Sequence, residues 1–172
     1  MSDMFDKVTA DQDPVKRIAS KIPGFGGYIE RQNRRAADKL VREQIAARYT
    51  ELRAEVTALQ QDLASEGELT LLDDLEKAAM KLQTFIDKIE NAAHGYSGFF
   101  DAVKINEEEL AQLYEYDMAL LAMDDEVERA IENVSTSIGS DGLPAAVRHL
   151  VGLSRDLVTA FEKRDEAITA IS

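Results

Sequence analysis

The chain has 172 residues, with 33 acidic and 20 basic side chains, so its formal net charge is -13 and its isoelectric point is near 4.6. Hydrophobic residues make up 45%, which is enough for a folded core and argues against disorder over most of the length. The absence of cysteine excludes disulfides, thiolate zinc sites, iron–sulfur clusters and cysteine nucleophiles. The longest apolar run, Met118 to Met123, is too short to cross a bilayer, so we expect a cytoplasmic protein.

The first 27 residues are predicted to be a segment of their own. A glycine-rich bend, Pro23-Gly-Phe-Gly-Gly27, ends this segment. Before the bend, apolar residues recur at spacings that suit one side of a short helix: Phe5, Val8, Val15, Ile18 and Ile22. The pattern therefore predicts a short amphipathic helix followed by a bend, preceding a main domain over residues 28–172. This segment either folds back onto the main domain or binds elsewhere.

Four long helices are predicted in the main domain, over residues 28–64, 68–94, 107–138 and 142–171. Apolar residues recur there at alternating spacings of three and four, which is a helical pattern. The connections near residues 65–67 and 139–142 are short, so the helices that they join should run antiparallel. The sequence predicts an all-α fold: an elongated antiparallel four-helix bundle with a short N-terminal amphipathic helix.

Three charged residues interrupt the apolar positions of the third and fourth helices: Asp117, Asp124 and Arg164. A turn centred near residue 140 pairs positions whose numbers sum to about 280. This register places Asp117 opposite Lys163 or Arg164, and Asp124 opposite residues 154–156. Because an unpaired buried carboxylate is costly, we expect an ion pair between Asp117 and Arg164 that fixes the register of the two helices.

Motifs for catalysis or metal binding are weak in this sequence. Neither His94 nor His149 belongs to the Glu-x-x-His motif of di-iron helical bundles. The strings Gly95-Tyr-Ser-Gly98 and Gly24-Phe-Gly-Gly27 follow no predicted strand, so neither fits a nucleophile elbow or a phosphate-binding loop. We therefore expect no enzymatic activity and no cofactor or metal, with a carboxylate-based metal protein as the least favoured function.

The charges are divided between two regions of the chain. Residues 16–42 contain eight basic and two acidic residues, whereas residues 107–133 contain ten acidic residues and only Arg129 as a base. Such opposed patches can steer copies of the chain, or another protein, toward one another. The net negative charge disfavours nucleic acid.

The favoured function is a non-enzymatic protein–protein interaction or assembly module that uses the basic N-terminal segment and the acidic third helix, with a protein partner or a second copy as the binding partner. Arginine and aromatic side chains provide much of the energy at protein interfaces. The expected contact residues are Phe25, Tyr28, Arg31, Arg34 and Arg35.

An alternative function is binding to an anionic membrane surface through the N-terminal helix. Lysine and arginine beside an apolar row suit a helix that lies on anionic lipid. The layout of an amphipathic start, Asp13-Pro14 and a long helix resembles membrane-remodelling coiled coils of the phage-shock-protein A type. The residues expected to contact lipid are Phe5, Val8, Val15, Lys16, Arg17, Ile18, Lys21 and Ile22.

Several sequence strings resemble an uncharacterised bacterial family of all-helical proteins. They are Lys21-Ile-Pro-Gly-Phe-Gly-Gly-Tyr28, Arg31–Arg35 with Ala37-Asp38, the aromatic connector Gly95–Ile105, and Leu113-Tyr-Glu-Tyr-Asp117. The resemblance runs from about residue 20 onward. It implies a bacterial cytoplasmic origin and a connector that belongs to the shared core design, and it implies no activity or catalytic residue.

Overall fold

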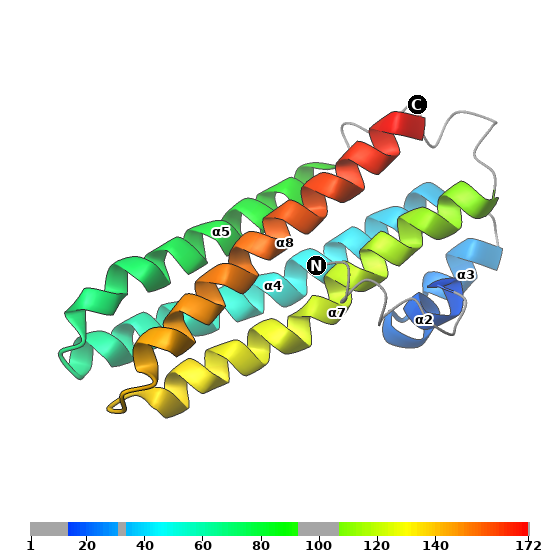
Figure 1. The fold of residues 1–172 in the computed structure, drawn as a ribbon. Helices are drawn as coiled ribbons and strands as arrows, with labels where there is room; N and C mark the ends of the chain where they lie inside the picture. The colour runs from blue at the N-terminus through cyan, green and yellow to red at the C-terminus, as the bar shows by residue number, and fades with distance from the viewer. Residues whose placement is uncertain (1–13, 31–33, 93–106, 172) are drawn as a thin grey trace.

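The computed structural model describes residues 14–30, 34–92 and 107–171, and over these residues the protein is helical with no strand, which confirms the predicted all-α class. The helices are α2 (Pro14–Lys21), α3 (Phe25–Glu30), α4 (Arg34–Ser65), α5 (Leu72–Asn91), α7 (Glu107–Ser137) and α8 (Leu143–Ile171), with a 3₁₀ turn η1 (Leu69–Leu71) before α5 (Figure 1). None of these described helices is both long and apolar enough to span a membrane.

The four long helices lie side by side (Figure 1). Helix α4 packs on α5, α5 on α8, α8 on α7 and α7 on α4. Short turns join α4 to η1 and α7 to α8, and each contains a glycine in the left-handed region, Gly67 with φ 79° and Gly139 with φ 82°. Because side chains with a Cβ rarely adopt this conformation, these glycines allow the chain to reverse within a few residues.

The core consists of the apolar positions that recur along the four long helices. Tyr49 of α4 is fully buried, and its ring meets Phe85 of α5 edge to face, with centroids 4.8 Å apart. Phe85 in turn meets Phe161 of α8 at 6.3 Å. The Tyr49 hydroxyl donates a hydrogen bond of 2.6 Å to the carbonyl oxygen of Leu120 in α7. The Tyr49 side chain therefore links α4 to both α5 and α7.

Helices α2 and α3 pack on the side of the long helices, α2 against α7 and α3 against α4. Ile18, Ile22 and Phe25 are buried there, and the Phe25 ring meets Tyr114 of α7 edge to face at 5.3 Å. Ile18 lies in α2, Ile22 in the turn that follows it and Phe25 at the start of α3, so the buried face continues across the turn. Helices α2 and α3 are thus joined to the main core, and Phe25, which we expected to contact a partner, is buried in it.

The apolar run in α7 is explained by this packing. The buried residues of the run point in all directions around the helix: Met118, Ala119, Leu120, Leu121 and Met123. A helix with apolar residues on every side is buried on every side. Helix α7 packs on α4 and α8, and α2 covers a further part of its surface.

Some predicted boundaries and residues differ from the structure. The first long helix begins at Arg34, and α5 begins at Leu72 because η1 takes the preceding turn. Phe5, Val8, Arg31 and the whole aromatic connector lie outside the described residues.

Candidate functional site

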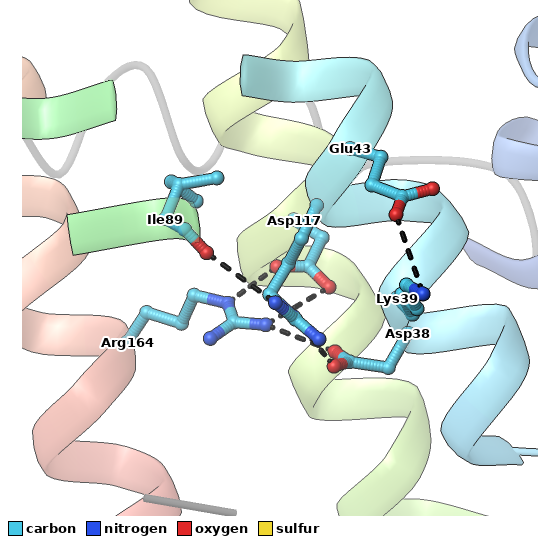
Figure 2. Close-up of polar contacts among 7 residues, drawn as sticks. Asp38, Lys39, Glu43, Ile89, Asp117 and Arg164 are labelled. Atoms are coloured by element: carbon cyan, nitrogen blue, oxygen red, sulfur yellow. Dashed lines mark hydrogen bonds and ion pairs between the residues drawn. The ribbon is translucent and has the colours of Figure 1, made fainter. Parts of the chain in front are cut away.

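Four charged side chains are buried together inside the long helices, and we call them the charge layer: Asp38 and Arg42 of α4, Asp117 of α7 and Arg164 of α8 (Figure 2). Asp117 and Arg164 have no exposed surface, and Asp38 is 1% exposed. Burying charges without partners is very costly, so the contacts within the layer decide what these residues can do.

Arg164 joins the two carboxylates of the charge layer. Its Nε and Nη2 donate to Asp117, with 3.3 Å from Nη2 to Oδ2, and Nη2 also lies 3.2 Å from Oδ1 of Asp38. Arg42 donates from Nε to Oδ2 of Asp38 at 2.8 Å and from Nη1 to the carbonyl oxygen of Ile89 in α5 at 3.4 Å. All four long helices therefore contribute to one polar layer.

The charge layer is neutral and its carboxylates are fully engaged. Two guanidinium groups face two carboxylates, and each of the four carboxylate oxygens accepts a hydrogen bond. Burial raises the pKa of Asp117, and the charge and hydrogen bonds of Arg164 oppose that rise. Because arginine stays protonated and no carboxylate oxygen is free, the layer suits a structural role better than acid–base chemistry.

The predicted ion pair between Asp117 and Arg164 is present. Asp124, which we expected opposite residues 154–156, has its hydrogen-bond partner in α4. It is half-buried and accepts a hydrogen bond of 3.1 Å from Nε of Arg48 in α4, because it lies on the side of α7 that turns toward α4. Ser154 instead donates to the carbonyl oxygen of Leu150 in its own helix.

Sequence reasoning missed three residues of this polar network, Asp38, Arg42 and Arg48. A signal for Asp38 was available, because it precedes the apolar positions Val41 and Ile45 by three and seven residues. These spacings place Asp38 on the same buried face of the helix. Its i, i+4 neighbour Arg42 then provides the nearest opposite charge.

The residues expected to bind a partner or lipid are found in several environments. Phe25, Ile18 and Ile22 are buried, so the structure corrects the expectation that they are available for contact. Lys16 and Lys21 of α2 are exposed and Arg17 is half-buried. The remaining residues are placed by their helices alone: Val15 in α2, Tyr28 in α3, and Arg34 and Arg35 at the start of α4.

Grooves open on the outer surface of the long helices, and two of them border α4. The larger, about 580 Å³, lies between α4 and α5 and has mixed charges: Lys39, Arg42, Glu43, Ala46, Ala47, Thr50 and Glu90. The second, which we call the acidic groove, has a volume of about 370 Å³ and lies between α4 and α7: Glu55, Ala58, Leu59, Asp62, Glu128, Ile131, Glu132 and Ser135. In the part of the chain that the structure describes, no three His, Cys, Asp or Glu side chains are arranged to hold a metal ion.

No protein-family model, curated protein or solved structure matches this chain.

Proposed function

We propose that the chain is a non-enzymatic protein–protein interaction or assembly module, built as an elongated antiparallel four-helix bundle with α2 and α3 packed on its side. The observation that carries this proposal is the opposite charge of two exposed regions. Helix α2 has Lys16, Arg17 and Lys21 and no acidic residue. The second half of α7 presents mainly carboxylates, including exposed Asp125, Glu128 and Glu132. Opposed charges of this kind favour encounter with charged protein surfaces.

The charge layer supports a role without catalysis. Its carboxylates already accept hydrogen bonds from Arg42 and Arg164, and its residues are buried among the long helices. A neutral polar layer of this type can fix which helices pair and in which register. We therefore assign the charge layer to architecture and the exposed charges to binding.

Membrane binding is the less favoured alternative. A helix that lies on lipid must turn its apolar face to the membrane. In this structure Ile18 and Ile22, the apolar face of α2, are packed against the protein. Membrane binding through α2 would therefore require the helix to leave its position on α7.

The proposal is tested by removing the exposed basic charges of α2. The double variant Lys16→Gln with Lys21→Gln keeps the buried apolar face of α2, since both lysines are exposed. We expect sedimentation velocity to show self-association of the wild-type protein at low salt, weakened about fivefold in this variant. The control variant Lys81→Gln with Lys163→Gln removes two exposed lysines from α5 and α8 and should associate like the wild type.

A wild-type protein that stays monomeric at every concentration, or two variants that associate equally, would contradict assembly through α2. Sedimentation with phosphatidylserine vesicles tests the alternative in parallel. Vesicle binding that is lost only in the α2 variant would favour the membrane function.

A further inference from the structure

One stripe of α7 changes its character halfway along the helix. Tyr114, Leu121, Glu128 and Ser135 are spaced by seven residues, so they lie close to one line on the helix surface. Tyr114 and Leu121 are buried, whereas Glu128 and Ser135 line the acidic groove. The acidic groove therefore continues the face of α7 on which the N-terminal segment packs.

The first half of this face already holds a short basic helix. Phe25 contacts Tyr114, and α2 and α3 pack across α7 and α4 (Figure 1). Helix α2 carries Lys16, Arg17 and Lys21 beside its buried isoleucines. The outer face of α4 and α7 thus accommodates a basic amphipathic helix in the protein itself.

The second half of the face has like charges on both walls. Glu55 and Asp62 extend from α4, Glu128 and Glu132 from α7, and the described lining contains no lysine or arginine. Arg48 reaches Glu128 at 3.0 Å, at the end of the groove nearer the middle of the helices. Among the described residues, Glu55, Asp62 and Glu132 form no ion pair with a basic side chain. Like charges that face each other across a helix pair disfavour the packing.

The floor of the acidic groove is apolar. It is formed by Ala58, Leu59 and Ile131, and the last two are only 3% and 4% exposed. The carboxylates do not converge as ligands of one metal ion within the described residues. These carboxylates are spread along the groove on both sides of its apolar floor. They suit a helix whose small apolar side chains lie on the floor and whose lysine or arginine side chains reach the carboxylates on either side.

We infer that the acidic groove is the docking site for a basic amphipathic helix of a partner protein. The partner helix would lie between α4 and α7, in line with the α2–α3 segment, and its cations would relieve the repulsion between the groove walls. This inference rests on the proposed function, because it names the kind of partner that the interaction module binds.

The test uses the full-length protein and a fluorescein-labelled synthetic peptide of lysine, alanine and leucine, in a repeat that places lysines beside one apolar row. Fluorescence anisotropy measures its dissociation constant at low salt. The groove variant combines Glu55→Gln, Asp62→Asn and Glu132→Gln. We expect it to bind the peptide about tenfold more weakly than the wild type, because it loses three exposed charge contacts that each contribute modestly to affinity.

The matched control makes the same chemical changes elsewhere: Asp87→Asn, Glu162→Gln and Glu166→Gln, all exposed residues of α5 and α8. It has the same net charge as the groove variant and should bind within about twofold of the wild type. The groove variant should also unfold at a temperature no lower than the wild type, since it removes repulsion. This separates a loss of binding from a loss of folding.

Equal loss of affinity in the groove and control variants would overturn the inference, because the peptide would then be responding to net charge alone. In another outcome, the wild type self-associates and only the groove variant loses this association. That result would overturn the inference that the groove binds another protein, and would identify a second copy of the chain as the occupant. The peptide assay does not depend on Lys16 and Lys21, so failure of the groove is distinguishable from failure of the proposed function.

Discussion

Arg164 is the residue on which the charge layer depends, because one guanidinium group binds carboxylates of two different helices. Asp38 has a second partner in Arg42, at 2.8 Å, whereas both carboxylate oxygens of Asp117 accept hydrogen bonds from Arg164. The pairs Asp38–Arg42 and Asp117–Arg164 are each neutral. Removing both members of one pair therefore leaves the other pair balanced.

We predict that Arg164→Leu alone lowers the free energy of unfolding by about 3–5 kcal/mol, because it leaves Asp117 buried without its partner. The double variant Asp117→Leu with Arg164→Leu should recover most of that loss, since no unpaired charge remains. Urea unfolding of the wild type, both single variants and the double variant measures the coupling.

The pH dependence of the stability of the Arg164→Leu variant tests whether the unpaired Asp117 carboxylate causes the loss. Burial raises the pKa of Asp117 above its ordinary value of 3.8, so the folded state binds a proton more readily than the unfolded chain. The cost of Arg164→Leu should therefore shrink as the pH falls from neutral toward 3.8. Equal losses in the single and double variants, or a cost that does not change with pH, would contradict a stranded carboxylate.

At the scale of the elements, α2 and α3 depend on docking for their stability. Helices of eight and six residues are too short to be stable alone in water. Three buried side chains, Ile18, Ile22 and Phe25, anchor them to α7 and α4. The long helices share a larger set of contacts with one another, so we expect the segment to detach before they unfold.

We predict that Ile22→Ala releases α2 without unfolding the long helices. The loss of a buried isoleucine costs about 2–5 kcal/mol, which α2 cannot replace from its other contacts. Trypsin should then cut at Lys16, Arg17 and Lys21 faster than in the wild type, while the thermal midpoint changes little. The control Ile45→Ala, in the middle of α4, should lower the midpoint clearly. A similar fall in both variants would mean that α2 is an integral part of the core.

The helical elements and one polar contact could be predicted from the sequence because both depend on local spacing. The three-and-four alternation marks the buried sides of α4, α5, α7 and α8, and a short turn sets the register that brings Asp117 to Arg164. The partner of Asp124 could not be found in this way. Its partner Arg48 is 76 residues away in the chain. Their contact therefore depends on how α7 packs against α4.

The position of α2 also required tertiary information. The spacing of Ile18, Ile22 and Phe25 shows an apolar face and does not show what covers it. From the sequence, a partner, a membrane or the chain itself could cover this face. The excess of apolar residues in α7 around Met118–Met123 was the one local indication that α7 needs cover on an additional side.

At the scale of the whole molecule, a net charge of -13 means that carboxylates repel one another over the surface. The repulsion is concentrated where Glu55, Asp62 and Glu132 line the acidic groove. The charge layer is different, because its charges are paired and its side chains are buried, Arg42 at the edge being 6% exposed. Dissolved ions should therefore screen the surface and leave the layer almost unaffected.

We predict that raising sodium chloride from about 20 mM to about 500 mM increases the thermal unfolding midpoint by a few degrees, since the screening length shortens to a few ångströms. The groove variant Glu55→Gln, Asp62→Asn, Glu132→Gln should show a smaller rise. Differential scanning calorimetry measures both. A midpoint that falls with salt would show that surface ion pairs outweigh the repulsion.

The charge layer also bears on the order in which a newly made chain can fold. Asp38 meets Arg42 within one turn of the same helix, so this pair is complete as soon as α4 has been synthesised. Asp117 must wait for a guanidinium 47 residues further along. Until the ribosome has delivered Arg164, closing α7 onto α4 and α5 would enclose a bare carboxylate. We therefore expect α4 and α5 to pair early during translation, and α7 to settle into place only together with α8.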